Sequence, residues 1–282
     1  MARTLTPLLE GLAFPEGPRW HDGRLWFSDM HARTVLTVTP AGKTEEILRV
    51  EERPSGLGWL PDGRLLVVSM HDRRLLRVEP DGTRVVHADL SSLARHHCND
   101  LVVDAHGHAF VGNFGFDLDA GATPTTTALL RVDPDGSAHV ASADMSFPNG
   151  AVITPDGETL IVAETFGSCL SAFDLASDGI LSNRRVWAQL EKAVPDGICL
   201  DAEGAIWVAS PTSKEILRVR EGGNVTERIP TDQMAIACML GGEERRTLFI
   251  LTSESVSPEE CEVSRDARIL TTEVEVPGAG LP

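Results

Sequence analysis

The feature that most constrains the fold of this chain is a pair of adjacent β-type runs that recurs six times. In each pair, the second run is rich in β-branched and apolar residues and directly follows a polar turn. The pairs recur at intervals of roughly 40 to 50 residues, a period typical of β-propellers. The repeat therefore predicts an all-β fold, a six-bladed β-propeller with four-stranded blades. The second runs are Arg24–Ser28, Arg64–Ser69, His108–Asn113, Thr159–Glu164, Ala205–Ser210 and Thr247–Thr252.

The turns between the runs support this interpretation. In five of the six, glycine is the third residue of the turn, as in His21–Gly23 and Pro61–Gly63, and a tight hairpin needs a residue with positive φ. A propeller must also close so that no sheet edge stays exposed. We therefore expect a strand from one terminus, either Leu5–Leu12 or Arg268–Val276, to join the blade formed by the other end.

Composition and length fit one folded unit without a linker. The chain has 282 residues, enough to bury a substantial core, and we expect a single propeller domain over residues 1–282. Its net charge of −17 repels phosphates and anionic lipids, so nucleic-acid and membrane partners are not expected. The N-terminal residues hold no apolar secretory core, which favours a cytoplasmic protein. Five cysteines without paired spacing indicate reduced thiols.

Aligning the six pairs with one another reveals a column of oxygen-bearing side chains where the first runs begin. In a propeller the innermost strands surround a central channel, so these positions converge on its axis. Turn preferences explain each local motif, but they do not require carboxylates to line up in a channel, where buried charges need a compensating cation. Carboxylate and amide oxygens without thiols suit a hard divalent cation. The column reads Glu16, Ser55, Asn99, Asn149, Asp196 and Ala235.

Other motifs are weaker indicators of chemistry. Ser28–His31 has the residue types of a hydrolase cluster, but it aligns with Ser69–Asp72 in the next repeat and so marks a repeated loop. The absence of a GxSxG elbow, a Walker motif and a strand-linked GxGxxG argues against serine hydrolases and nucleotide or dinucleotide enzymes. The segment Gly112–Asp119 leads into a polar insertion at Ala120–Thr127, which predicts either a lid or a mobile rim loop.

Several short motifs, taken in their order and spacing, resemble the SMP-30/gluconolactonase/LRE-like family, which includes regucalcin. The resemblance covers nearly the whole chain and implies a six-bladed propeller with divalent-metal-dependent lactone hydrolysis. It implies one cation, with Ca²⁺ favoured and Zn²⁺, Mg²⁺ or Mn²⁺ as alternatives, and a small-molecule lactone as the partner. The motifs are Pro15–Pro18, Cys98–Asp100, Phe147–Gly150, Ser182–Arg185, Pro195–Gly204 and Ile206–Ala209.

The resemblance also assigns roles to single residues. It places the metal ligands at Glu16, Asn149 and Asp196, with Asn99 close enough to bind either metal or substrate. Regucalcin-type sugar lactonases carry an arginine two residues before that asparagine, whereas this chain has His97. The acidic substrate contact of the following loop corresponds to Asp117. We therefore expect Asn99, His97 and Asp117 to bind substrate, and the departure at residue 97 leaves sugar specificity open.

A lactone-opening mechanism follows from this set. Water must attack an ester carbonyl whose oxygen gains negative charge, and a cation there stabilises that charge and acidifies water. Asp196 is the expected general base, because a carboxylate with one oxygen on the metal can accept a proton on the other. His97 is either a proton or hydrogen-bond donor or an exposed rim residue. Two alternatives remain: a calcium-dependent phosphotriesterase of the diisopropyl fluorophosphatase type, and a non-catalytic calcium-binding propeller.

Overall fold

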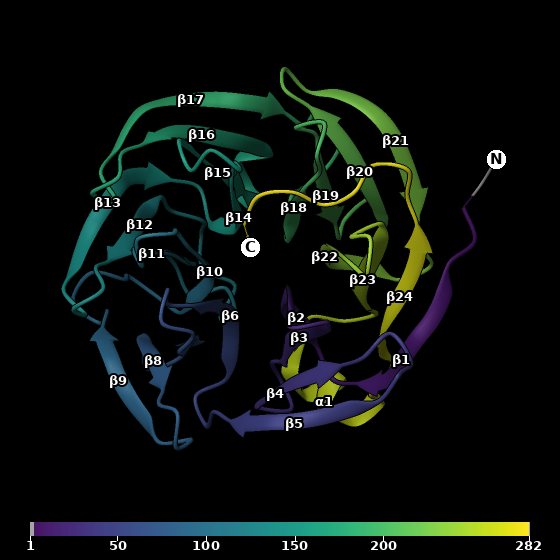
Figure 1. The fold of residues 1–282 in the computed structure, drawn as a ribbon, viewed down its shortest axis with the longest axis horizontal. Helices are drawn as coiled ribbons and strands as arrows, with labels where there is room; N and C mark the ends of the chain where they lie inside the picture. Colours follow the sequence, from purple (N-terminus) through teal and green to yellow (C-terminus); the bar gives the residue numbers. More distant parts are fainter. Residues whose placement is uncertain (1–2, 282) are drawn as a thin grey trace.

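The structure is a computed structural model that describes residues 3–281. The protein is a ring of six four-stranded antiparallel sheets (Figure 1). This confirms the six-bladed propeller predicted from the repeat. Residues 1, 2 and 282 of the expected domain lie outside the described residues. The six apolar runs predicted from the sequence all form the second strand of a blade, counted from the central channel.

Each of the first five blades is a meander of four consecutive strands. The first blade contains β2 to β5 (Pro15–His21, Arg24–Asp29, Thr34–Val38, Thr44–Arg49), and the second contains β6 to β9 (Pro54–Trp59, Leu65–Ser69, Arg74–Val78, Arg84–Asp89). The third contains β10 to β13 (Cys98–Val103, Ala109–Asn113, Thr127–Val132, Ala138–Met145). The fourth contains β14 to β17 (Pro148–Ile153, Thr159–Glu164, Cys169–Leu175, Leu181–Gln189), and the fifth contains β18 to β21 (Ile198–Leu200, Ile206–Ser210, Glu215–Arg220, Asn224–Pro230).

The sixth blade closes the ring with strands from both ends of the chain. It combines β22 (Met234–Gly241), β23 (Thr247–Ser253) and β24 (Ala267–Glu273) with the N-terminal β1 (Thr6–Leu12). Figure 1 shows the purple N-terminal strand beside the yellow C-terminal one, and their antiparallel register pairs Thr6 with Thr271. Of the two predicted closures, the structure contains the one in which the N-terminal strand joins the C-terminal blade. Closure covers the outer edge of β24, which would otherwise be unpaired.

The innermost strands lie so close together that glycine is needed for a steric reason. Each innermost strand contacts the innermost strands of both neighbouring blades. A Cβ on Gly56 would lie 2.4 Å from the backbone nitrogen of Leu101, and one on Gly150 would lie 2.7 Å from that of Ile198. The hairpin glycines serve the purpose predicted for them, as Gly23 has a φ of 71°. Tight inner packing brings the starts of these strands together at one mouth of the channel.

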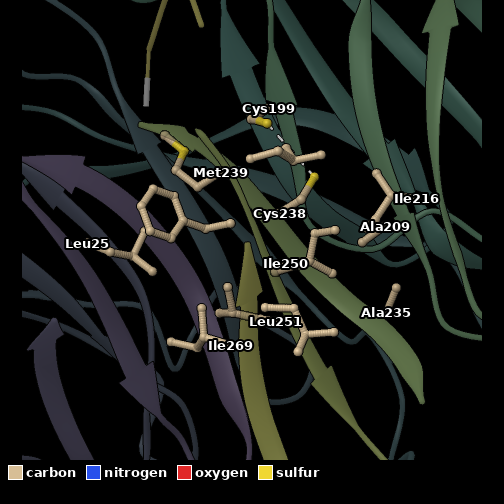
Figure 2. Packing of buried hydrophobic residues seen from close by; sticks show 14 of the residues in the cluster. Leu25, Cys199, Ala209, Ile216, Ala235, Cys238, Met239, Ile250, Leu251 and Ile269 are labelled. Carbon is tan, nitrogen blue, oxygen red and sulfur yellow. Dashed lines mark hydrogen bonds between the residues drawn. The ribbon is translucent and has the colours of Figure 1, made fainter. Parts of the chain in front are cut away.

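Apolar side chains fill the space between blades. In the cluster drawn in Figure 2, residues from the first blade (Leu25), the fifth (Ile216) and the sixth (Ile250) belong to one buried core. Cys199 and Cys238 meet in this core with their sulfur atoms 3.8 Å apart, so they are not bonded. All five cysteines are free and buried, which confirms the expectation of reduced thiols.

One short helix within the sixth blade was not expected from the sequence. Helix α1 (Pro258–Ser264) begins after Ser257, whose hydroxyl accepts a hydrogen bond from the Glu260 backbone, and Pro258 stands in its first turn. Both features are common at the start of a helix. The segment is too short to show the periodic apolar pattern from which a helix could be predicted. Among residues 3–281, no helix combines the length and apolar character that crossing a bilayer requires.

Candidate functional site

The aligned oxygen column lies in a cavity of 410 Å³ at the start of the innermost strands. Glu16, Asn99, Asn149 and Asp196 all line this cavity, and so does His97. Asp117 is not among the lining residues, whereas Asp119 is. The Asp117 carboxylate lies 3.8 Å from the His96 ring and accepts a hydrogen bond from the Ala120 backbone. The structure thus brings together five of the six site residues predicted from the sequence. The sixth, Asp117, does not line the cavity.

A larger hollow elsewhere on the molecule lacks this convergence. Its volume is 1020 Å³, and turns such as Pro155–Glu158 and Asp104–His106 form its walls. No residue of the aligned column lines it. The smaller cavity is therefore the candidate active site.

Two acidic side chains in the cavity have strongly perturbed proton affinities. Glu16 is 5% exposed, and burial raises its pKa well above the usual range, with the charges of Asp196 and Asp100 acting in the same direction. Burial also raises the pKa of Asp196 to about 8, against a hydrogen bond from Asn149 and together with the charge of Asp100. Carboxylates that are both desolvated and mutually repelling are destabilised in their ionised forms. A bound cation would relieve both effects.

A buried ion pair beneath these carboxylates leaves their charge uncompensated. Arg19, on β2, forms an ion pair of 2.7 Å with Asp100 on β10, and it also donates to the Leu101 carbonyl. Burial raises the pKa of Asp100, whereas Arg19 lowers it. The Arg19 guanidinium is engaged by Asp100. Glu16 and Asp196 therefore have no cationic partner of their own among the described residues. Nothing in the sequence marks Arg19 except its place in an inner strand.

Asn149 is tied into a network that leaves its amide oxygen available. Its Nδ2 donates to Asp196 and also to the Thr165 hydroxyl at 3.1 Å, and Thr165 in turn donates to the Pro195 carbonyl at 2.9 Å. Among the described residues, none donates a hydrogen bond to Asn149 Oδ1. An amide oxygen beside two carboxylates completes a set of hard oxygen ligands suited to Ca²⁺ or Mg²⁺.

Asn99 occupies the next position around the channel. Its side chain is 4% exposed, and its Oδ1 accepts a hydrogen bond of 3.3 Å from the Ser55 hydroxyl. Its Nδ2 has no acceptor among residues 3–281. Asn99 is therefore fixed by one hydrogen bond and can donate another to an oxygen atom of a bound molecule.

Imidazoles gather on the same side of the cavity mouth. The His97 ring contacts His71 edge to face at 4.2 Å and stacks on His96, also at 4.2 Å. Burial lowers the pKa of His97 to about 3, with the neighbouring histidines acting in the same direction, so the ring is neutral near pH 7. His71, His97 and Asp119 each offer a ligand atom within 4.8 Å of the others. Two imidazoles and a carboxylate are ligand types that Zn²⁺ accepts, in contrast to the all-oxygen set at the channel axis.

One wall of the cavity is apolar and aromatic. Phe114 stacks on Phe147 with ring centroids 4.5 Å apart, and Phe166 packs against the edge of Phe147 at 5.3 Å. Sequence reasoning missed this wall, because its members lie on loops of several blades and share no periodic pattern. The apolar residues that line the cavity are Phe14, Met30, Met70, Phe114, Leu118, Phe147, Phe166, Val194 and Val256.

The loops that the sequence marked as repeated also reach the cavity. Ser28–His31 and Ser69–Asp72 follow equivalent strands of the first two blades, and they carry His31 and His71 to the cavity wall. The segment that leads from β11 into the insertion contributes Leu118 and Asp119 to the wall. The repetition of the first two loops was recognisable in the sequence, but their orientation toward the channel was not.

Comparison with known proteins identifies the family to which the chain belongs. The SMP-30/Gluconolactonase/LRE-like region family matches residues 14–254, which include every member of the oxygen column. The chain belongs to this family. Within it, a 6-deoxy-6-sulfogluconolactonase of Pseudomonas putida is 27% identical, over 95% of this chain and 93% of that protein. A gluconolactonase of Zymomonas mobilis is 24% identical, over 87% of this chain and 78% of that protein.

Solved structures of the SMP-30/gluconolactonase type share the fold over the whole chain. A calcium-binding regucalcin from Agrobacterium tumefaciens superposes with a TM-score of 0.83 at 21% identity, covering 100% of this chain and 97% of that one. A gluconolactonase from Xanthomonas campestris gives a TM-score of 0.75 at 26% identity, covering 99% of this chain and 89% of that one.

Proposed function

We propose that this protein is a divalent-cation-dependent hydrolase that opens a small lactone. The observation that carries the proposal is the buried pair Glu16 and Asp196, which shares a cavity with Asn149 and has no cationic partner among the described residues. Relatives named gluconolactonase and 6-deoxy-6-sulfogluconolactonase support lactone hydrolysis as the chemistry. The regucalcin from Agrobacterium tumefaciens, described as calcium-binding, supports Ca²⁺ as the cation.

The donor set fits a hard cation. Glu16 and Asp196 would supply carboxylate oxygens and Asn149 would supply the amide oxygen that has no hydrogen-bond donor among residues 3–281. These three residues are the proposed ligands, with Ca²⁺ favoured over Mg²⁺, Mn²⁺ and Zn²⁺ because all three donors are oxygen. When bound, the cation would polarise the lactone carbonyl and lower the pKa of a nearby water.

The protein's own groups would divide the remaining work. Asp196, oriented by the Asn149 amide, would accept the proton of the attacking water. Asn99 would donate from Nδ2 to a substrate oxygen, since Ser55 already holds its Oδ1. His97 is neutral near pH 7, so it would contribute a hydrogen bond to the substrate and not the positive charge of an imidazolium.

The cavity wall favours a lactone with an apolar substituent. Phenyl rings and thioethers make up much of the cavity lining, and they offer few hydrogen-bond partners to a ring that carries a hydroxyl on most carbons. Burying an apolar substituent there would release water from both surfaces, at about 25 cal/mol per Å² removed from water. We therefore propose aryl- or alkyl-substituted lactones as better substrates than polyhydroxylated sugar lactones.

The decisive experiment is a hydrolysis panel on chelated protein. Sugar lactones, alkyl lactones, aryl lactones and a diisopropyl fluorophosphate analogue are assayed before and after separate additions of Ca²⁺, Mg²⁺, Mn²⁺ and Zn²⁺. We expect lactone turnover that disappears with chelation and returns with Ca²⁺. Turnover confined to the phosphotriester would replace the proposal with the phosphotriesterase alternative. Calcium binding without turnover of any ester would support the remaining alternative, a non-catalytic calcium-binding propeller.

A further inference from the structure

Two side chains in the cavity carry buried nitrogen atoms without a hydrogen-bond partner among the described residues, and the proposed reaction does not use them. His31 is 6% exposed; its ring lies near the Val256 backbone, but neither ring nitrogen has hydrogen-bond geometry with a described residue. The Nε of Arg53 is also buried without a partner, and no described carboxylate forms an ion pair with this guanidinium. Both residues line the cavity. Buried polar groups are normally hydrogen-bonded because an unpaired one costs free energy, so two at one place point to a missing ligand group.

The backbone of Arg53 is hydrogen-bonded, and the ring of His31 packs on another ring. Arg53 has a φ of 66°, its amide donates to the Val50 carbonyl at 3.1 Å, and its own carbonyl accepts from Met70 at 2.9 Å. His31 packs on the ring of Phe14 with centroids 4.9 Å apart. The Arg53 backbone and the His31 ring are therefore held before a ligand binds, which lowers the ordering entropy that binding costs.

Arg53 forms no ion pair with any described carboxylate, although Glu16, Asp119 and Asp196 line the same cavity. The imidazoles of His31, His71 and His97 also line it, and their pKa values are lowered first by burial and also by this guanidinium. The acidic side chain of Glu259, on α1, is exposed and accepts its hydrogen bond from Ser257 instead. A guanidinium without an ion-pair partner attracts an anionic group of a ligand.

The blade repeat explains how an arginine comes to be there. Arg53 stands two residues before Ser55, and His97 stands two residues before Asn99. Because Ser55 and Asn99 are equivalent positions of adjacent blades, Arg53 and His97 are equivalent as well. Neighbouring blades therefore present a guanidinium and an imidazole to the same cavity from the same strand-entry position.

We propose that Arg53 and His31 form a subsite for an anionic oxygen group, a carboxylate or a sulfonate, on a ligand whose apolar body packs against the phenyl wall. Arginine presents a planar fork of donors that matches such groups, and a neutral imidazole adds one more donor. The inference rests on the proposed function in one respect, that the ligand is a lactone. Binding to the subsite can be measured without turnover.

Isothermal titration with matched probes tests the subsite. The Ca²⁺-loaded protein is titrated with 3-phenylpropionate, 3-phenylpropane-1-sulfonate and the uncharged 3-phenylpropionamide. Because hydrogen bonds to charged groups are stronger than those between neutral groups, we expect about 10- to 100-fold tighter binding of at least one anion than of the amide. The Arg53→Gln variant should lose this preference and still bind the amide. The control Arg33→Gln removes the same charge from an exposed arginine beside Glu51 and should keep the preference.

The outcomes separate the subsite from the reaction. If the wild type shows no anion preference, or if Arg53→Gln retains it, the subsite is wrong and any bound anion is held elsewhere. Melting temperatures establish that each variant is folded, and Arg53→Lys, which keeps the charge but lacks the fork, should retain only part of the preference. If no lactone is hydrolysed but the anion preference depends on Arg53, the proposed reaction fails and the subsite stands.

Discussion

Asn149, at the start of β14, donates a hydrogen bond from its side-chain amide to the carboxylate of Asp196, which lies two residues before β18 in the next blade. The two side chains meet because the backbones are close: a Cβ on Gly150 would lie 2.8 Å from the Asp196 carbonyl. Packing between blades thus sets the orientation of the carboxylate. One oxygen of Asp196 receives this hydrogen bond, and a proton acceptor with a fixed direction is what general-base catalysis needs.

Replacing Asp196 with Asn should separate catalysis from cation binding. The amide keeps an oxygen for the cation but cannot accept the proton of the attacking water. We expect kcat for lactone hydrolysis to fall by about 100-fold or more, because general-base catalysis contributes about 10²- to 10⁴-fold. Calcium titration of the same variant should still detect a bound ion. Parental turnover with the cation bound would show that Asp196 is not the base.

Replacing Asn149 with Ala should have the complementary effect. The variant loses one proposed ligand and the hydrogen bond that orients Asp196, while the base itself remains. We expect weaker Ca²⁺ binding and a rate that rises again as the ion is added in excess. A rate that stays low at saturating Ca²⁺ would assign Asn149 to orienting Asp196 alone.

The raised pKa of Asp196 predicts how pH changes stability. Its folded pKa of about 8 exceeds the unfolded value of about 4, so above the unfolded value the unfolded chain ionises while the folded protein keeps the proton. In chelated protein this group should therefore destabilise the fold progressively from about pH 4 to about pH 8. Since Ca²⁺ competes with that proton, its addition should raise the melting temperature more at pH 8.5 than at pH 6. An equal increase at both values would place the bound ion away from Asp196.

The sequence was sufficient for the fold because the propeller repeats its local signals. Each hairpin glycine and each β-branched run marked one blade, and the closing strand had only two candidates, of which the structure contains the one at the N-terminus. The same repeat placed Glu16, Asn99, Asn149 and Asp196 in one column, because equivalent strand starts must meet at the axis of a ring. All four line one cavity.

The rest of the cavity depends on loops whose directions no repeat specifies. Arg53 and His31 occupy repeated positions, but only the closed ring turns them toward the same space. Phe166 lies in a short 3₁₀ turn after β15, and its contact with Phe147 joins segments that a linear pattern does not relate. The turn around Asp117 directs that side chain to His96, whereas Asp119 lines the cavity. Both residues are aspartates, so residue type alone could not show which of them reaches the cavity.

His97 should affect substrate binding more than the chemical step. Its pKa of about 3 keeps the ring neutral across the working pH range, so it cannot supply an imidazolium proton to the leaving oxygen. We expect His97→Gln, which keeps a hydrogen-bond donor, to change KM and the ranking of lactones while kcat stays within about 10-fold, below the usual contribution of a general acid. Kinetics on several lactones measure this. A collapse of kcat on every lactone would instead make His97 the general acid.

The apolar wall should discriminate between substrates through Phe166. This side chain is 49% exposed, so replacing it with Ala removes a face of the cavity without opening a hole in the core. For a phenyl-substituted lactone we expect kcat/KM to fall about 10-fold, the equivalent of about 1.4 kcal/mol and within the range of one aromatic contact. Gluconolactone, which has no apolar substituent to place there, should be hydrolysed at nearly the parental rate. Val186→Ala, at a position that is 62% exposed on the outer strand β17, serves as the control and should change neither. Equal losses on both lactones would show that Phe166 supports the shape of the cavity and does not contact the substituent.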